Sequence, residues 1–358
     1  MQEQENLTYR FPASLALLPE EVKQELSQAI LYYPKTRCSI LEVGHRSSFF
    51  KEILEEAIFL TQKILKIPRS FSIFFLQGSS SFGFAISAYN AQKKYKKVAF
   101  LESDFWSSKA LETTESLGLE TVIVGSSKFN NFHHLPIIEK KNQAVDYLHF
   151  TSNNTIAGTQ YQTFPISSVP LVADMTSDIF TRDLDFSNAG IFYAGLQKSL
   201  CANALGLYLV REDCIEEKKD VPKVFQVFSY KKENGIYHTP NIFGIFTALL
   251  MLRWMDQQGG ISFFSQKNRE KAQLIYEALE QNPYFKLLVK KEDRSLINII
   301  FDLGKNISEE TFKNHLKENK IFDIEGHRLS GGYRISLYNT IKLNSVKYLA
   351  EILRKFKV

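Results

Sequence analysis

The 358-residue chain carries 44 lysines and arginines against 39 aspartates and glutamates, a net charge of +5, and 44% of its residues are apolar. This composition is close to the globular average and excludes a disordered chain or a fibre, while the length favours two packed units. The three cysteines, Cys38, Cys201 and Cys214, form no CxxC pair, which argues against a disulfide scaffold or a thiolate metal site. We expect a folded protein of the reducing cytoplasm.

Signals for export, membrane insertion and nucleic-acid binding are weak. The first 22 residues, MQEQENLTYRFPASLALLPEEV, carry acids where a secretory signal needs a basic stretch and an apolar run. The most apolar segment, residues 242–255, contains Arg253 and is shorter than the roughly 20 residues of a membrane span, so it predicts a buried helix. The lysines within residues 93–97 are typical of a solvated face.

The first two thirds of the chain have an α/β pattern. Residues 50–66 predict an amphipathic helix, because their apolar side chains recur at spacings of three and four. Apolar runs separated by helix-like stretches then begin at Ser72, Val98, Thr121, Tyr147, Pro170, Ile191 and Gly206. They are apolar on consecutive residues, as in strands covered by helices on both faces. The fold class is therefore α/β, with a large domain built on a mostly parallel seven-stranded sheet between helices.

The pattern changes from about Gly259. A long charged helix over 263–280 precedes a strand over 296–304, a helix starting near Ser308, a strand over 333–339 and a final helix to Phe356. These elements predict a smaller α+β C-terminal domain. We expect a large domain over residues 16–258 and a small domain over residues 1–15 and 259–358.

Asp174 and Lys198 are the first candidates for chemistry. Each follows a predicted buried strand, and open α/β sheets bind ligands at the carboxyl ends of their strands. A lysine there can form a Schiff base with a cofactor aldehyde, and the acid can keep a pyridine nitrogen protonated. The alternative is a strand-end ion pair beside an ordinary surface lysine, since such residues are common.

Other residues near the ends of predicted strands are further candidates for the site. The sequence QGSSSF over residues 77–82 opens a helix and can receive a phosphate, although a plain capped helix fits it equally well. Trp106 can stack on a planar ring, although a lone tryptophan more often belongs to the core, and Thr155 offers a hydroxyl. The two Gly-His-Arg sequences at 44–46 and 326–328, with Arg334, can bind anions bidentately, surface charge being the alternative.

The order of these segments resembles the phosphoserine aminotransferases, pyridoxal-phosphate enzymes of class V with fold type I. The resemblance is carried by HFTSNNTIAGTQYQTFP, VPLVADMTSDIFTRDLD, GIFYAGLQKS and GHRLSGGYRISLYN, and by residues 40–47. It spans residue 17 to the C-terminal helix. It implies transamination of O-phospho-L-serine with 2-oxoglutarate, giving 3-phosphohydroxypyruvate and L-glutamate in serine biosynthesis, with 4-phosphohydroxythreonine of pyridoxine biosynthesis as a further substrate.

The resemblance also implies residue roles. Lys198 would bind pyridoxal 5′-phosphate as a Schiff base and shuttle a proton, Asp174 would pair with the pyridine nitrogen, and Trp106 would stack on the ring. Further cofactor contacts are expected from Ser80, Ser81, Thr155 and Gln197, and from His238 and Thr239 of the second subunit of a homodimer. Substrate binding falls to His45, Arg46, His327, Arg328 and Arg334, with the pair at 327–328 completing a phosphate pocket across the dimer interface. No metal, membrane or nucleic-acid partner is implied.

Several positions depart from the family pattern. Residues 11–14, Phe-Pro-Ala-Ser, stand where the family has Asn-Ala-Gly-Pro. In the phosphate loop Ser79 and Gly83 replace a glycine and a glutamine, His238 replaces an asparagine, and Cys201-Ala202 replaces Gly-Pro. Since Lys198, Asp174 and Trp106 are retained, these changes bear on the substrate or on cofactor affinity more than on the reaction type.

Three alternatives stay open. A diverged class V aminotransferase would act on a different amino acid and would tolerate replacement of Arg328. A catalytically silent dimeric binding protein would keep its function without Lys198. Cysteine desulfuration is disfavoured, because Cys201 is expected to pack into a loop with nothing arranged to lower its pKa.

Overall fold

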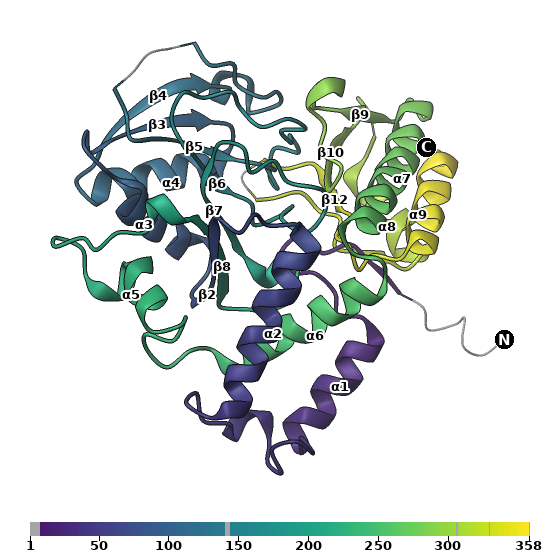
Figure 1. Ribbon diagram of the computed structural model, residues 1–358. Helices are drawn as coiled ribbons and strands as arrows, with labels where there is room; N and C mark the ends of the chain where they lie inside the picture. Colours follow the sequence, from purple (N-terminus) through teal and green to yellow (C-terminus); the bar gives the residue numbers. More distant parts are fainter. Residues whose placement is uncertain (1–7, 140–143, 306, 329, 358) are drawn as a thin grey trace.

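A seven-stranded sheet forms the centre of the larger part of the molecule (Figure 1). The computed structural model describes residues 8–139, 144–305, 307–328 and 330–357. The strand order is β2-β8-β7-β6-β5-β3-β4, and only β8 runs antiparallel to its neighbours. The strands are β2 (Phe71–Gln77), β3 (Lys97–Glu102), β4 (Glu120–Ser126), β5 (Tyr147–Thr151), β6 (Leu171–Asp174), β7 (Ala189–Gly195) and β8 (Leu205–Arg211). The mostly parallel sheet is confirmed.

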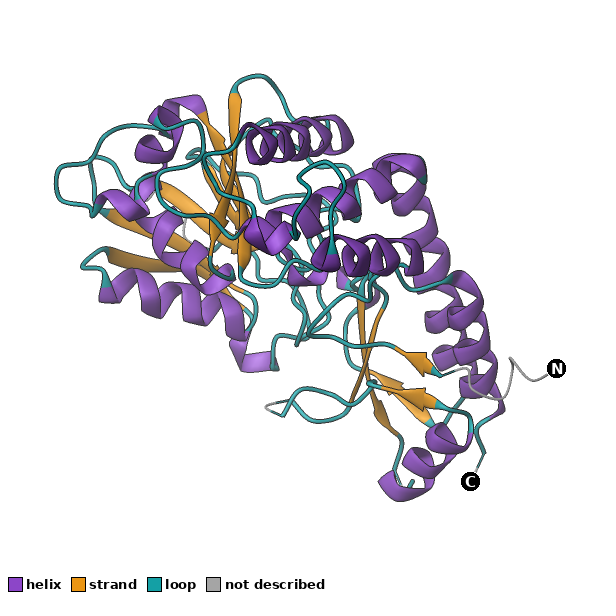
Figure 2. Cartoon of the chain, turned by 90° about the horizontal axis from the view of Figure 1, so that it is seen from below, coloured by secondary structure: helices purple, strands orange, loops and turns teal. Residues whose placement is uncertain are grey.

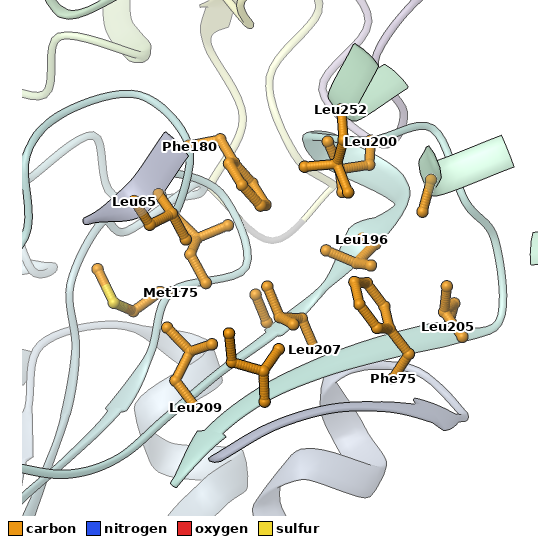
Figure 3. Packing of buried hydrophobic residues seen from close by; sticks show 14 of the residues in the cluster. Leu65, Phe75, Met175, Phe180, Leu196, Leu200, Leu205, Leu207, Leu209 and Leu252 are labelled. Atoms are coloured by element: carbon orange, nitrogen blue, oxygen red, sulfur yellow. The ribbon is translucent and has the colours of Figure 1, made fainter. Parts of the chain in front are cut away.

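Helices bury both faces of this sheet. One face packs against α2 (Ser48–Leu65) and α6 (Ile242–Gln257), and the other against α3 (Ser80–Ala91) and α4 (Phe105–Ser116). Phe75 of β2 points into the first core, while its neighbours Phe74 and Leu76 point into the second. Figure 3 shows the first core, where Leu207 of β8 lies with Phe75 and Leu196. Burial on both faces explains why these strands are apolar on consecutive residues.

A second, smaller body carries its own sheet and core. Strands β12 (Tyr333–Ser336), β10 (Asn298–Leu303) and β9 (Phe285–Leu287) form an antiparallel sheet, and β1 (Tyr9–Arg10) pairs with β11 (Ile321–Phe322). Figure 2 shows these strands apart from the large sheet. They pack against α7 (Gly260–Gln281), α8 (Glu309–Glu318) and α9 (Leu343–Lys355). The described part of the N-terminal strip therefore contacts the C-terminal region. Residues 1–7 lie outside the described residues.

Helix α7 connects the two bodies. Ile261 and Phe264 belong to the core of the large sheet, whereas Ala272 and Ile275 belong to the second core. Since this one helix contributes to both cores, the cores do not fix the domain boundary. A boundary between the two domains at residue 259 remains our proposal. The other helices are α1 (Glu20–Leu31), α5 (Val227–Lys232) and the 3₁₀ turns η2 (Ile40–Glu42), η3 (Lys128–Asn130), η4 (Leu196–Lys198), η5 (Glu212–Cys214), η6 (Lys223–Phe225) and η7 (Lys291–Asp293).

Two classes of feature are absent from the described residues. None of their helices combines the length and apolarity needed to cross a membrane. The same residues contain no cluster of three or more histidine, cysteine, aspartate or glutamate side chains that could hold a metal ion.

Candidate active site

A pocket of about 270 Å³ lies at the carboxyl ends of the parallel strands. Asp174 is the last residue of β6, Lys198 ends the 3₁₀ turn after β7, and Thr155 follows β5. The parallel topology brings these three strand ends to one edge, as the sequence predicted. Eight predicted residues line the pocket: Ser80, Trp106, Thr155, Asp174, Gln197, Lys198, His327 and Arg334.

The Lys198 amine is held at the wall of this pocket. Its Nζ donates a 2.9 Å hydrogen bond to Oγ1 of Thr155. Loss of water around the amine lowers the pKa of Lys198 to about 8, although the nearby Asp174 carboxylate opposes the shift. A substantial fraction of the amine is therefore neutral near physiological pH, as a nucleophile or a general base requires.

Asp174 is a buried carboxylate with one oxygen already committed. Its Oδ1 accepts hydrogen bonds of 3.0 Å from the amide and 2.6 Å from the hydroxyl of Thr176. Burial raises the pKa of Asp174, with the Thr176 hydrogen bonds and Lys198 opposing the shift. Asp178, the other acid of the sequence ADMTSD over residues 173–178, instead forms a 2.9 Å ion pair with Arg182 and so has a structural partner. Asp174 is thus the acid of the pair that can face a cationic ring nitrogen.

The N-terminus of α3 opens beside the same pocket. Gly78 turns the chain with φ of 123°, and Ser79 precedes the helix without a side-chain cap. The first amides of a helix have no intrahelical acceptor, so they can bind an anion such as a phosphate. The end of β7 lies close to the start of this helix, because a Cβ on Gly195 would lie only 3.0 Å from the amide nitrogen of Ser80. Ser80 lines the pocket, whereas Ser81 is exposed and does not.

Trp106 occupies the first turn of α4, where it can cover one face of a planar ring. The carboxylate of Asp104 caps this helix by accepting hydrogen bonds of 2.8 Å from the Trp106 amide and 3.0 Å from the Ser107 amide. The cap fixes the turn from which the indole reaches the pocket.

Cationic groups of the smaller body complete the pocket. Arg334 of β12 donates through Nη1 to the backbone oxygen of Thr155 at 3.2 Å, and its buried Nε has no hydrogen-bond partner among the described residues. An arginine stays charged even though burial lowers the pKa of Arg334, so its remaining donors suit a carboxylate. His327 lines the same pocket, with its ring centroid 6.4 Å from that of Phe105.

The other predicted anion-binding residues lie elsewhere in the chain. His45, Arg46, His238 and Thr239 line a second pocket of about 710 Å³, between the start of α2 and the loop before α6. Arg328 is exposed and lines neither pocket. Within one chain, therefore, the structure does not bring these five residues together with Lys198.

Sequence reasoning missed part of the pocket wall. Ala13 and Ser14, from the segment that departs from the family pattern, line the pocket directly. Further lining residues that were not predicted are Thr151, Asn153, Ile156, Thr176 and Ser177. Asp104, which is buried two residues after β3 and does not line the pocket itself, was not singled out either.

Two departures from the family pattern have a structural setting. Gly83 of α3 packs against Tyr193, because a Cβ there would lie 2.3 Å from the tyrosine ring. The Cys201 thiol lies 3.5 Å from the backbone oxygens of Ala16 and Leu17, and burial raises its pKa to about 12. The expected packing of Cys201 is confirmed, and this thiol is not activated.

Comparisons with known proteins agree with this geometry. The family model described as "Aminotransferase class-V" matches residues 8–349. The phosphoserine aminotransferase of Flavobacterium johnsoniae is 37% identical over 348 residues, covering 97% of this chain and 98% of the relative, and that of Bacillus subtilis is 35% identical, covering 98% of each. A solved phosphoserine aminotransferase from Bacillus circulans subsp. alkalophilus superposes with a TM-score of 0.91 at 34% identity, covering 97% of each chain. The PLP-bound enzyme from Trichomonas vaginalis superposes with 0.92 at 27% identity, covering 98% of this chain and 100% of that one.

Proposed function

Because this chain belongs to the class-V aminotransferases, among the phosphoserine aminotransferases, we propose that it transfers the amino group of O-phospho-L-serine to 2-oxoglutarate. The products are 3-phosphohydroxypyruvate and L-glutamate. The observation that carries the proposal is the convergence of an amine, a carboxylate and a guanidinium, from Lys198, Asp174 and Arg334, on one pocket.

The cofactor of this family is pyridoxal 5′-phosphate, and the pocket fits it. Lys198 would hold the cofactor aldehyde carbon, Asp174 would face the ring nitrogen, and Trp106 would cover the ring. The uncapped amides at the start of α3 would bind the phosphate, with Ser80 and Gln197 beside them. When bound, the cofactor supplies an electron-accepting ring that stabilises the charge left on the substrate Cα after deprotonation.

Lys198 has two successive tasks in this proposal. It would hold the cofactor covalently while no substrate is bound. Once free, its Nζ would accept the proton of the substrate Cα and later give that proton back. Its lowered pKa of about 8 favours this exchange, since the amine is neither fully protonated nor a strong base near neutral pH. The Thr155 hydroxyl orients the amine through its hydrogen bond.

Substrate recognition requires donors for a carboxylate and a phosphate. We assign the carboxylate to Arg334, which lies inside the pocket, and place His327 beside the phosphate. His45, Arg46, His238 and Thr239 share another pocket of the same chain, and we propose that a second copy presents them to this site in a homodimer. Arg328 would join them from its exposed loop, and Ser81 would contact the cofactor phosphate from the first turn of α3.

The physiological setting follows from the proposed reaction. We propose that the enzyme acts in the cytoplasm in serine biosynthesis. The same donors would admit 4-phosphohydroxythreonine, which also carries an amino acid and a phosphate, and this extends the proposal to pyridoxine biosynthesis.

A spectral titration tests the proposal. The protein loaded with pyridoxal 5′-phosphate is titrated separately with phosphoserine, serine and glutamate, and the absorbance of the bound cofactor reports conversion to its amine form. Conversion by phosphoserine at far lower concentration than by serine is expected. Conversion by glutamate without any response to phosphoserine would leave an aminotransferase with a diverged substrate. The control is Lys198→Ala, which should lose both the coloured adduct and turnover; full turnover without it would favour a different enzyme.

A further inference from the structure

Asp104 is a buried carboxyl beside the active pocket to which the roles assigned above give no chemical task. It lies two residues beyond β3, at the start of α4, with none of its surface exposed. Its Oδ1 accepts both hydrogen bonds of the helix cap. The Asp104 amide in turn donates a 2.9 Å hydrogen bond to Ser107 Oγ. Its Oδ2 is buried without a hydrogen-bond partner among the described residues.

The helix cap alone does not explain an aspartate at this position. Serine and asparagine cap helices about as well as aspartate, and neither would place an ionisable group at a buried position. Burying a carboxylate with an oxygen that has no partner is unfavourable unless another charge compensates for it. Such a carboxyl therefore either retains a proton or lies near a compensating positive charge.

The charged groups that shift the pKa of Asp104 belong to the catalytic pair. They are the Asp174 carboxylate at the end of β6 and the Lys198 amine in η4. The charged groups that shift the pKa of Lys198 are Asp174, Arg334 and Asp104. The two acids favour its ammonium form, and Arg334 disfavours it. The charges that shift the pKa of Asp174 are those of Lys198, which lowers it, and Asp178, which raises it.

The balance of charge gives these two acids different states. One ammonium compensates one carboxylate, so the second carboxyl of the group releases its proton only at higher pH. Burial, together with repulsion by Asp174, raises the pKa of Asp104 to about 7. Asp104 thus changes charge in the pH range in which Lys198 must both release and accept a proton.

We propose that Asp104 is a positioning residue for Lys198. One oxygen fixes the turn that carries Trp106, and the other, when ionised, supplies a negative charge that stabilises the ammonium form of Lys198. This inference rests on the proposed function, since it takes Lys198 as the reactive amine.

The test uses protein freed of cofactor. Pyridoxal 5′-phosphate is added over a range of pH, and the rate at which the specific chromophore forms reports the fraction of Lys198 that is a free amine. For the wild type the midpoint is expected near pH 8. In Asp104→Asn and Asp104→Ser, which keep an oxygen acceptor for the cap, the midpoint should fall to a lower pH because a stabilising charge is lost.

A matched control removes another buried carboxyl of the same region. Glu102, the last residue of β3, bonds to Ser108, Ser126 and Lys128 rather than acting on Lys198. Glu102→Gln should therefore leave the midpoint near pH 8. Thermal unfolding and tryptophan fluorescence establish that each variant is folded.

The outcomes separate this inference from the proposed function. An unchanged or raised midpoint in a folded Asp104→Asn or Asp104→Ser protein would overturn the role of Asp104, and a changed melting temperature without a shifted midpoint would leave Asp104 a helix cap only. If Asp104→Asn does not fold, Asp104→Ser decides. Failure of the wild type itself to form the chromophore would overturn the proposed function instead.

Discussion

Lys198 Nζ and Thr155 Oγ1 lie 2.9 Å apart although 43 positions separate the two residues in the chain. The hydrogen bond spans the end of β6, because β7 precedes Lys198, β5 precedes Thr155, and β6 lies between those two strands. Asp174 is the last residue of β6 and therefore lies between the two partners. The strand order thus sets an amine, a hydroxyl and a carboxylate around one pocket.

This relationship predicts a difference between two Thr155 variants. Thr155→Val keeps the shape of the side chain but removes the hydroxyl that orients Lys198, so cofactor affinity should fall by about 1–2 kcal/mol. Thr155→Ser keeps the hydroxyl and should stay close to the wild type. Dissociation constants from absorbance titration measure the effect, and a loss in Thr155→Ser without one in Thr155→Val would mean that methyl packing rather than the hydrogen bond matters.

The sequence predicted the large sheet and the centre of the site well, for the same physical reason. Strands buried on both faces are apolar on consecutive residues, and parallel strands end at one edge, so residues following them converge. Asp174, Lys198 and Thr155 were found in this way. Single-residue choices in helices and loops were harder: Ser80 faces the pocket and Ser81 does not, since one residue turns a helix by about 100°.

The repeated Gly-His-Arg sequence shows a second limit. His45 and Arg46 precede α2 and line one pocket, whereas His327 lines the other and Arg328 is exposed. Loop conformation leaves no periodic signal in the sequence, so the motif alone could not assign its two copies to different places. The burial of Asp104 was likewise invisible, because it arises only when α4 packs against the sheet.

Arg334 should distinguish substrate binding from cofactor binding. Arg334→Ala removes the guanidinium that we assign to the substrate carboxylate, so amino-acid and oxo-acid binding should weaken by about 2–5 kcal/mol. Arg334→Lys keeps the charge without the two-pronged donor and should recover only part of the loss. Substrate and cofactor dissociation constants are compared for each variant. A similar loss for cofactor and substrate would contradict the assignment.

Mixed dimers test whether Arg46 serves the pocket of the other subunit. Neither Lys198→Ala nor Arg46→Ala homodimers should turn over phosphoserine appreciably. A heterodimer of the two contains one site with an intact Lys198 facing an intact Arg46, so about half of the wild-type activity should return. Differently tagged subunits are co-expressed, and the heterodimer is purified and assayed.

The control for the mixed dimers pairs Lys198→Ala with Arg334→Ala. Both residues line the same pocket of one chain, so no site in this heterodimer contains the two intact groups. Its activity should remain near that of the homodimeric variants. Absence of activity in the Arg46 heterodimer would place Arg46 in its own subunit's site or away from either. Return of activity in the control would contradict the placement of Lys198 and Arg334 in one site.

Lys271 is expected to stabilise the smaller body. Its buried Nζ, in α7, donates hydrogen bonds of 3.0 Å to the backbone oxygens of Leu337 and Tyr338 and of 3.5 Å to that of Ile341. These carbonyls follow β12, the strand that carries Arg334, so Lys271 ties the strand end to the helix. Lys271→Met should lower the free energy of unfolding by about 3 kcal/mol or more, because buried carbonyl oxygens lose their donor.

Urea unfolding monitored by circular dichroism measures this loss. Lys267→Met, one turn earlier on the same helix, removes a partly exposed lysine paired with Glu270 and should change stability by no more than about 0.5 kcal/mol. A Lys271→Met protein as stable as this control would show that the three carbonyls find other donors or water. Because β12 also positions Arg334, the destabilised variant should bind substrate more weakly as well, in proportion to the loosening of that strand end.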